Sequence, residues 1–518
     1  MKTEIEIRTG EELRICEEVE EAIQRARLGV YASGGRLVVA IEGDTLDTNR
    51  REAKSTRLLT ITKHRMKVIM VQACRFGYVE YEGNKRHFRL LPVSSSIADM
   101  ILARNGYWPF EEVSGLMCCQ SIDTDGNVIN KEGVHRESGL LFRNLPKLPP
   151  IPEHPTRADA LVALDVFKDL LKEFPFVDPD GKKDQSLSVA ISMLVSPLAS
   201  AAFRKAPITL VRAPVAGTGK SFLCRIAAAL MIGRSPAIVP YTADETEFEK
   251  RLTGIILQGS PLVVFDNVNG VLSSLLLCQA LTEDEIDVRP LGTSVISRTK
   301  VRAAWIANGN NISATSDLLR RCLLSILDRN EERPELHAFT RNPLAEVMAD
   351  RGKFIAAALT ILRAYAEAGR PDRKPKLASY EEWSDVVRSA LCWLGLPDPV
   401  GSMEEIRGED EGQQKIQAVI DAWPVLNMPY TVKELVECTK GTVDQWGNTD
   451  IPANVPLREA FEDIAVTRTG DLNTKSIGRF LLRNMDRVFP HPGKIAVKLR
   501  KVDAGINKAK WQLDEVKG

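Results

Sequence analysis

The stretch RAPVAGTGKSFL, residues 212–223, decides how the rest of the chain is interpreted. It ends in GTGKS, the close of the phosphate-binding pattern GxxxxGK[ST]. In that pattern the N–H groups of a glycine-rich turn surround a β-phosphate, the lysine contacts the β- and γ-phosphates, and the hydroxyl binds Mg²⁺. Gly217, Gly219, Lys220 and Ser221 hold these positions. A strand-like run precedes the loop and a helical run follows it, so we expect ATP and Mg²⁺ to bind here.

Pro214 stands where the pattern asks for its first glycine. Proline fixes φ near −65°, which suits a chain leaving a strand wherever that turn does not need a positive φ. It removes one backbone donor at a position outside the phosphate cradle. The loop therefore remains a predicted nucleotide site. The predicted nucleotide contacts are Pro214, Val215, Ala216, Gly217, Thr218, Gly219, Lys220, Ser221 and Phe222.

The region around the loop alternates short apolar runs with helical segments. PITLVRA (207–213), PLVVFDN (261–267) and VRAAWIAN (301–308) are rich in β-branched or aliphatic residues. Such runs, separated by helical segments, predict a parallel sheet with crossover helices. We therefore expect an α/β nucleotide-binding core over residues 205–345, within a multidomain α/β chain.

The second apolar run ends in Asp266, placed to hold Mg²⁺ through its water shell together with Ser221. Many such ATPases continue with a glutamate that polarises the attacking water. This chain has Asn267, whose amide can orient water but cannot accept its proton. Either hydrolysis relies on positioning, or a base comes from elsewhere. The candidate bases are Glu245, Glu247 and Glu283.

The third run leads into an amide cluster, AAWIANGNN (303–311). Amides there can hydrogen-bond the γ-phosphate and the lytic water. Asn310 is the first candidate and Asn308 the second, with a plain Asn-Gly turn as the alternative. Further on, Arg320 and Arg321 stand at the end of a predicted helix and could reach a neighbouring subunit's γ-phosphate as arginine fingers. Their alternative is an ordinary solvated pair.

The order PVAGTGKS, VVFDNVNG, IANGNN and LLRRCLLSILD resembles an AAA+ ATPase. Within that group it is similar to the superfamily 3 helicases and related replication ATPases of phages, plasmids and integrative elements. VVFDNVNG is similar to the second motif of viral large T antigens, where a second acid stands at the position of Asn267. The resemblance covers about residues 205–330 and implies self-association into a ring, with a hexamer as the expected size.

The resemblance also implies a β-hairpin between the second motif and the Asn strand, which lines the pore of the ring and grips DNA. The matching interval is DVRPLGTSVISRTKVR (287–302), a hairpin-like segment with a Gly-Thr-Ser turn. Three cations flank this turn and are the DNA contacts that the resemblance implies. They are Arg289, Arg298 and Lys300.

Outside the core, LPKLPPIPEHPT (145–156) has five prolines and predicts a stiff extended linker. Upstream, a helix near residues 11–27 and strands at 36–43 and 77–93 predict an α+β domain. Acids after its first strand, Glu42, Asp44 and Asp47, are only faintly like a primase's carboxylates. The predicted parts are residues 1–144 (α+β), 145–156 (linker), 157–204 (helical), 205–345 (AAA+ core), 346–425 (helical) and 426–518 (basic, winged-helix-like).

The chain is neutral overall, with 69 Lys+Arg against 69 Asp+Glu, but its last stretch is basic. Residues 476–518 hold ten Lys or Arg against four acids. Arg479, Arg483 and Arg487 recur at helical spacing, and two strands that end at Trp511 follow. A helix plus a basic two-stranded wing is the outline of a winged helix, which predicts DNA contact by the arginine row. The alternative is a small solvated α/β domain for protein contacts.

Cysteine usage and the composition of the N-terminal segment indicate the cellular compartment of the protein. Nine cysteines without a CxxC pair indicate neither a zinc site nor a disulfide framework. The N-terminal segment is charged and carries no apolar signal. The uncharged run 186–203 contains five serines and Pro197, which predicts a buried helix and no membrane span. We expect a cytoplasmic protein.

Together these features predict an ATP-hydrolysing, ring-forming DNA helicase or translocase that replicates a mobile genetic element, acting on single-stranded or forked DNA. The alternative is an ATP-switched initiator or loader that remodels DNA without processive unwinding. Asn267 favours the alternative slightly, because slow hydrolysis suits a switch. A small-molecule kinase would explain neither the arginine pair nor the basic tail.

Overall fold

The structure is a computed structural model that divides into two compact units, Met1–Glu404 and Glu405–Gly518. The division precedes the predicted boundary at residue 426, because α15 (Glu411–Asp421) packs within the second unit, against α17 (Val455–Glu462). The structure describes residues 2–46, 52–177, 184–234, 237–242, 244–289, 296–331, 340–408, 411–440, 442–443, 449–451, 453–465, 471–491, 495–503 and 509–516.

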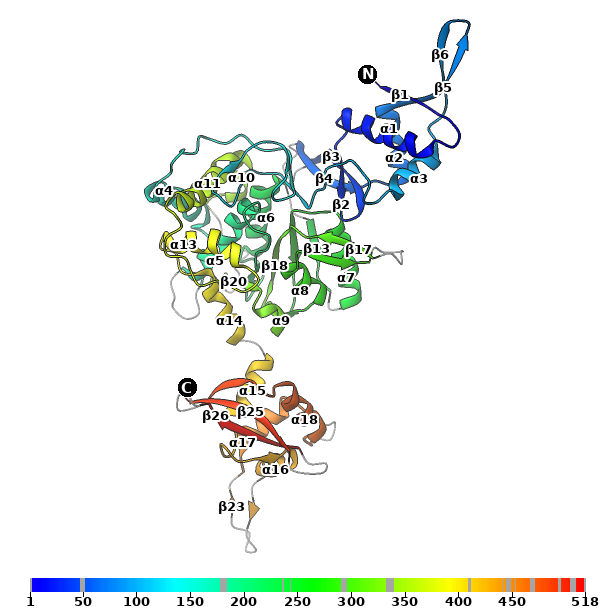
Figure 1. The fold of residues 1–518 in the computed structure, drawn as a ribbon. Coiled ribbons are helices and arrows are strands. Elements are labelled where there is room, and N and C mark those ends of the chain that lie inside the picture. The colour runs from blue at the N-terminus through cyan, green and yellow to red at the C-terminus, as the bar shows by residue number, and fades with distance from the viewer. Residues whose placement is uncertain are drawn as a thin grey trace. The chain divides into compact units, whose positions relative to one another are not determined.

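The centre of the first unit is a five-stranded parallel sheet, which confirms the predicted α/β core (Figure 1). Its strand order is β13-β14-β18-β12-β20. Because all five strands run parallel, their carboxyl ends share one edge of the sheet, where ligands of open α/β sheets bind. The strands are β12 (Ile208–Ala213), β13 (Ala237–Pro240), β14 (Leu262–Asp266), β18 (Ala304–Asn310) and β20 (Cys322–Ile326).

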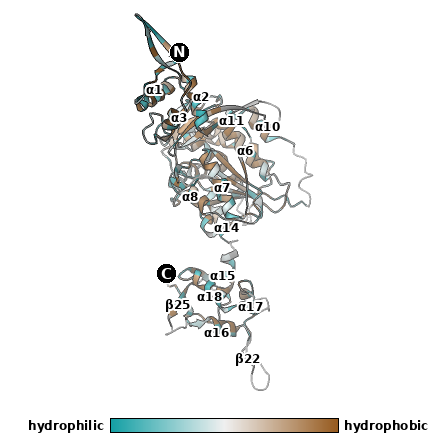
Figure 2. Ribbon diagram, turned by 90° about the vertical axis from the view of Figure 1, so that its right-hand side faces the viewer, coloured by the Kyte–Doolittle hydropathy of each residue, from teal (hydrophilic) through white to brown (hydrophobic). Residues whose placement is uncertain are grey.

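Helices cover this sheet, and several of them share one large hydrophobic core with it. Hydrophobic residues follow α6 along most of its length (Figure 2). The uncharged run forms the buried helix α5, as predicted, and continues into the 3-10 turn Ser196–Ala199 at Pro197. In the described part of the chain, no helix is both long and apolar enough to cross a membrane. The helices are α4 (Arg157–Leu171), α5 (Gln185–Val195), α6 (Lys220–Ile232), α7 (Glu245–Leu257), α8 (Leu275–Thr282), α9 (Ser316–Leu319), α10 (Pro343–Ala349), α11 (Arg351–Glu367), α12 (Glu381–Trp383), α13 (Ser389–Trp393) and α14 (Ser402–Gly408).

The N-terminal part of this unit mixes helices and small sheets around its own hydrophobic core. Its first helix buries Ile15, Val19 and Ile23 on one face, as its amphipathic pattern requires. Two three-stranded sheets have the orders β1-β5-β6 and β2-β3-β4. The elements are β1 (Thr3–Glu6), α1 (Glu12–Arg25), β2 (Val30–Ser33), β3 (Arg36–Leu46), β4 (Glu52–Thr60), α2 (Lys63–Ala73), β5 (Cys74–Glu82), β6 (Lys85–Leu90) and α3 (Ser95–Ala103).

The segment between the N-terminal core and α4 packs on the ATPase part. Short strands β7 (Gly115–Met117), β10 (Gly133–His135) and β11 (Leu140–Phe142) form a sheet whose residues Met117 and Phe142 lie in the large core. The proline-rich stretch follows without helix or strand. Its Lys147 carbonyl lies so near Gly352 that a Cβ there would be 2.0 Å away. At Lys147 the stretch therefore lies against α11.

The second unit packs helices against a four-stranded sheet of order β21-β26-β25-β24. A helix followed by strands is present as predicted, but α18 ends at Arg483. The helical row through Arg487 is wrong, because Asp486 adopts φ +63 and turns the chain before Arg487. The last strand also runs past Trp511 to Glu515. The elements are β21 (Tyr430–Thr431), α16 (Val432–Cys438), β22 (Thr442–Val443), β23 (Thr449–Ile451), α18 (Thr474–Arg483), β24 (Val488–His491), β25 (Ile495–Asp503) and β26 (Ala509–Glu515).

Candidate nucleotide-hydrolysis site

The phosphate loop joins the end of β12 to the start of α6. Gly217 has φ +82 and Gly219 has φ +100, a region that residues with a side chain rarely adopt. Pro214 does not lie in that region, so its ring is compatible with the backbone where the chain leaves the strand. The free N–H groups of the first turn of α6 point toward the loop, an arrangement that favours phosphate.

The side chain of Lys220 lies at the centre of the site and is only 8% exposed. Its ammonium donates to Asn310 Oδ1 at 2.7 Å and to the Val215 carbonyl at 2.8 Å. Burial lowers the pKa of Lys220, and the nearby Asp266 carboxylate opposes that shift. A cation partly withdrawn from water attracts phosphate oxygens more strongly than an exposed one.

Ser221 and Asp266 meet across the site. The Ser221 hydroxyl lies in the first turn of α6, and Asp266 is the last residue of β14. The hydroxyl donates to Asp266 Oδ1 at a distance of 3.0 Å. A hydroxyl and a carboxylate are oxygen ligands of the kind that Mg²⁺ takes, usually beside phosphates and water. The described residues contain no group of three or more His, Cys, Asp or Glu side chains that could hold a metal. The pair offers an ion two oxygen ligands and leaves its other positions to phosphate oxygens and water.

The structure separates the roles of the two asparagines on β18. Asn310 ends the strand and contacts Lys220 directly. Asn308 is 2% exposed, accepts a hydrogen bond from the Asn267 N–H at 3.4 Å, and contacts the sulfur of Cys224 at 3.5 Å. Asn308 thus ties β18 to the segment after β14, while Asn310 faces the phosphate loop.

Asn267 lines the site in the left-handed conformation, with φ +55. The next residue, Val268, packs so closely on β18 that a Cβ at Gly309 would lie 1.9 Å from its carbonyl oxygen. The turn carrying Asn267 is therefore held firmly against the sheet. Its amide can orient a water molecule but cannot take a proton.

The three predicted alternative bases do not belong to the described lining of the site. Glu247 lies in the first turn of α7 and pairs with Arg251, Nε to Oε1, at 3.1 Å. Glu283 lines a different pocket, and Glu245 also lies on α7. Among the described lining residues, Asp266 carries the single carboxylate.

A cavity of about 930 Å³ surrounds these groups and adds residues that sequence reasoning missed. Thr340, Arg341 and Asn342 line it from the segment before α10. Arg341 pairs with Asp169 at 2.8 Å and Glu346 at 2.5 Å, and these carboxylates raise its pKa above the ordinary value. In the sequence, Asn342-Pro343 is a typical helix start and was the one sign of an element here. In the structure, Asn342 caps α10 by accepting a hydrogen bond from the Ala345 N–H.

The arginine pair lies at the opposite edge of the sheet. Arg320 and Arg321 precede β20, whose Cys322 pairs with Ile208 at the start of β12. In a parallel sheet the amino ends of the strands lie away from the phosphate loop. Arg321 donates to the Asp317 carbonyl in its own turn. Neither arginine is among the described residues that line the cavity.

The interval between the second motif and the Asn strand forms a hairpin, as predicted. Strands β16 (Glu285–Val288) and β17 (Ser297–Lys300) pair antiparallel, and the Gly-Thr-Ser turn lies outside the described residues. Arg298 makes a two-pronged ion pair with Asp287 opposite it, at 3.0 and 3.1 Å. Arg289 follows directly after β16 on the surface.

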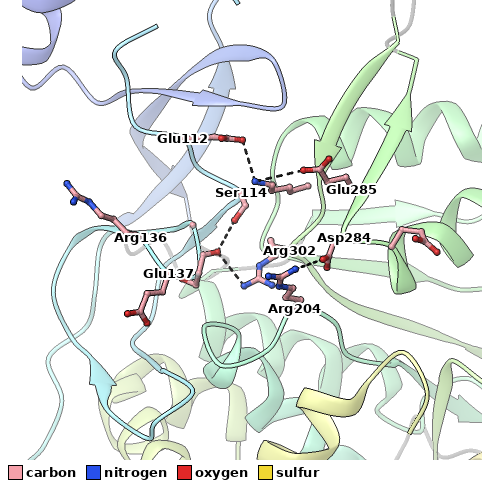
Figure 3. A pocket seen from close by; sticks show the side chains of 12 residues that line it. Glu112, Ser114, Arg136, Glu137, Arg204, Asp284, Glu285 and Arg302 are labelled. Carbon is pink, nitrogen blue, oxygen red and sulfur yellow. Dashed lines mark hydrogen bonds and ion pairs between the residues drawn. The ribbon is translucent and has the colours of Figure 1, made fainter. Parts of the chain in front are cut away.

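Lys300 lies at the root of this hairpin, beside a charged pocket of about 610 Å³. Its ammonium is 3.6 Å from a Glu112 carboxylate oxygen and 4.0 Å from one of Glu285. Figure 3 shows Glu112 and Glu285 entering this pocket from two different segments, and Arg204 beside Asp284. Cations predicted to contact DNA are thus balanced by carboxylates of the same chain.

Comparison with known proteins gives matches among solved structures. No protein-family model matches the chain. No curated protein matches it. The apo NrS-1 C-terminal region is 12% identical, with a TM-score of 0.36 over 84% of this chain and 93% of that one. SCCmec type IV Cch, described as an active helicase, is 11% identical, with a TM-score of 0.33 over 94% of this chain and 97% of that one. The JCV helicase is 15% identical, with a TM-score of 0.21 over 51% of this chain and 72% of that one.

Proposed function

We propose that the chain is an ATP-hydrolysing, ring-forming DNA helicase or translocase that serves replication of a mobile genetic element. The supporting observation is the convergence of Lys220, Ser221, Asp266 and Asn310. These side chains come from the first turn of α6, which follows β12, and from the ends of β14 and β18; the three strands are neighbours in the sheet. The 2.7 Å contact of Lys220 with Asn310 and the 3.0 Å contact of Ser221 with Asp266 join them into one polar cluster.

Each residue of the cluster has a chemical role in this proposal. Lys220 binds β- and γ-phosphate oxygens, and Ser221 and Asp266 would hold Mg²⁺, which supplies charge neutralisation on the phosphates when bound. Asn310 hydrogen-bonds at the γ-phosphate, and Asn267 orients the attacking water. With no second carboxylate in the described lining, hydrolysis relies on positioning and charge stabilisation.

In a ring, residues that take no part in their own chain's site would contact a neighbouring subunit or DNA. Arg320 and Arg321 lie away from their own site and would complete the site of the next subunit, as arginine fingers do. The β16–β17 hairpin would face DNA with Arg289, Arg298 and Lys300. In the second unit, Arg479, Arg483 and Arg487 are exposed and would contact phosphates through a winged-helix-like domain. A hexamer is the proposed size.

Two measurements test the proposal. ATP hydrolysis should rise on addition of single-stranded DNA and be lost in Lys220→Ala. Electron microscopy of the full chain with a non-hydrolysable ATP analogue and DNA should show rings with a central pore. Monomeric particles in a preparation of the full chain that hydrolyses ATP would contradict the ring.

A second candidate is an ATP-switched DNA-binding initiator or loader. It is favoured by Asn267, which replaces a catalytic acid, and by the carboxylates that already balance Arg298 and Lys300. This candidate predicts slow hydrolysis that DNA does not stimulate, with DNA affinity that differs between the ATP and ADP states. A DNA-stimulated turnover with equal affinity in both states would argue against it.

A further inference from the structure

The N-terminal part carries a β-hairpin that extends beyond its own hydrophobic core (Figure 1). Strand β5 pairs with β1 only from Cys74 to Gly77, whereas β5 and β6 pair with each other from Gly77 to Leu90. The outer half is therefore a two-stranded ribbon. An isolated two-stranded ribbon is marginally stable in water, so exposed apolar side chains on it call for an explanation.

Side chains alternate across the ribbon and give it two different faces. One face, which we call the charged face, compensates its own charges. On it, Arg89 pairs with Glu80 at 2.8 Å and with Glu82 at 3.2 Å, and His87 lies 3.7 Å from Glu82. The charged face consists of Tyr78, Glu80, Glu82, Lys85, His87 and Arg89.

The opposite face, which we call the aromatic face, combines rings, aliphatic groups and arginine without a carboxylate from the ribbon. Tyr81 is 69% exposed and Leu90 is 70% exposed, although large apolar groups usually gain by burial. Two acids of β1, Glu4 and Glu6, lie on the same side of the sheet as this face; Glu4 is 3.3 Å from Arg86, and Glu6 is 2.9 Å from Arg8. The aromatic face consists of Arg75, Val79, Tyr81, Arg86, Phe88 and Leu90.

The ring of Phe88 is held in a defined place on this face. It lies over Gly77, where a Cβ would come within 2.8 Å of a ring carbon, so glycine leaves the space that the ring fills. The Arg86 guanidinium lies 5.9 Å from the centre of the same ring. Tyr81 is the direct cross-strand partner of Arg86. Two rings and a guanidinium are thus presented together on one surface.

We propose that the aromatic face is a binding site for single-stranded nucleic acid. Bases stack on exposed aromatic rings with little regard to sequence, and arginine beside the rings contacts the backbone phosphates. Because Glu6 pairs with Arg8, Arg75 and Arg86 against Glu4 leave the face positive, which complements phosphate. A two-fold contact between copies would instead bring like arginines together, which is unfavourable. The site rests on the proposed function for its substrate and lies outside the ATPase core.

The test measures binding of a fluorescently labelled 20-nucleotide oligo-dT, and of a duplex of equal length, to the full chain by anisotropy without nucleotide. Tyr81→Ala should weaken single-strand binding at least about fivefold, the effect of losing one stacked base, and should change duplex binding less. Arg86→Gln should lower the slope of log affinity against log salt by about 0.7, one phosphate contact. Tyr78→Ala, on the charged face, is the matched control and should bind as wild type does.

Other outcomes would overturn the site. Equal single-strand affinity in Tyr81→Ala and wild type would remove this site while leaving the proposed helicase function intact. A change in molecular mass of Tyr81→Ala by light scattering, without DNA, would show that the face joins copies of the chain. Absence of DNA binding by the wild-type chain would overturn both this site and the proposed function.

Discussion

Replacing Asn310 by alanine removes the acceptor that lies 2.7 Å from the Lys220 ammonium, without touching the phosphate loop. Asn310 ends β18 and is half-buried, so the truncation leaves the sheet and its core in place. The exposed neighbour Asn311 provides a matched control. Its φ of +50 suits glycine, so Asn311→Gly alters an adjacent amide without strain or loss of the Lys220 contact.

The size of the effect follows from the kind of contact. A hydrogen bond to a charged group contributes about 1.5–3 kcal/mol. If Asn310 acts mainly when charge develops on the γ-phosphate, that loss appears in kcat as a fall of roughly 10- to 100-fold. ATP affinity should change less than about threefold, because Lys220 keeps its position beside the Val215 carbonyl.

The assay pairs steady-state ATP hydrolysis with equilibrium binding of a fluorescent ATP analogue. Wild type and Asn311→Gly should agree in both. An Asn310→Ala protein with wild-type kcat would refute the role given to Asn310. A large loss of nucleotide affinity with kcat preserved would show that Asn310 serves binding and has no part in hydrolysis.

Three further predictions address the ring, the hairpin and the N-terminal core. Arg321→Ala and Lys220→Ala should each be inactive in ATP hydrolysis, and mixing them should restore part of the activity because each supplies the group that the other lacks; no restoration would contradict action in trans. Glu112→Gln removes a carboxylate 3.6 Å from Lys300, which in the proposed function competes with DNA phosphate for the lysine. Affinity for single-stranded DNA, measured by anisotropy titration, should rise up to about fivefold, the range of an exposed ion pair. Weaker binding would contradict this competition between Glu112 and phosphate. Burial raises the pKa of Glu20 from 4.5 to about 7, more than the Arg104 ion pair at 3.3 Å lowers it. The folded state therefore holds a proton that the unfolded chain has lost, and stability falls as the pH rises from 4.5 to 7, by at most roughly 3 kcal/mol. Hydrogen exchange in α1, corrected for intrinsic rates, should show this loss in wild type, and Glu20→Gln should abolish it; equal pH dependence in both would contradict it.

The sequence predicted those parts of the fold and site that depend on local pattern. The phosphate loop is recognisable because its chemistry demands glycine and lysine at set spacing. The parallel strands are recognisable because both faces are buried and read as apolar runs. Asn308 and Asn310 could not be separated from sequence, because residues two apart lie on the same side of a strand. Their contacts differ because Lys220, at the start of α6, donates to Asn310, whereas Asn308 contacts the Asn267 N–H and the Cys224 sulfur.

Contacts between distant segments lay outside the reach of sequence pattern. Arg341 reaches the nucleotide cavity because α10 packs on α6, a contact across more than a hundred residues. The failure at Arg487 has a local cause, since helical spacing continues in the sequence whereas α18 ends at Arg483 and the left-handed Asp486 turns the chain before Arg487. The charge balance on Lys300 depends on Glu112, which no motif connects to the hairpin.

In the proposed function, ATP hydrolysis at this site drives movement along DNA. Displacement of a labelled strand from a forked duplex by the full chain tests it most directly. The proposed function predicts displacement that requires hydrolysable ATP and is absent in Lys220→Ala. Binding of the fork with ATP hydrolysis, but without displacement at any ATP concentration, would contradict the motor and favour the switch.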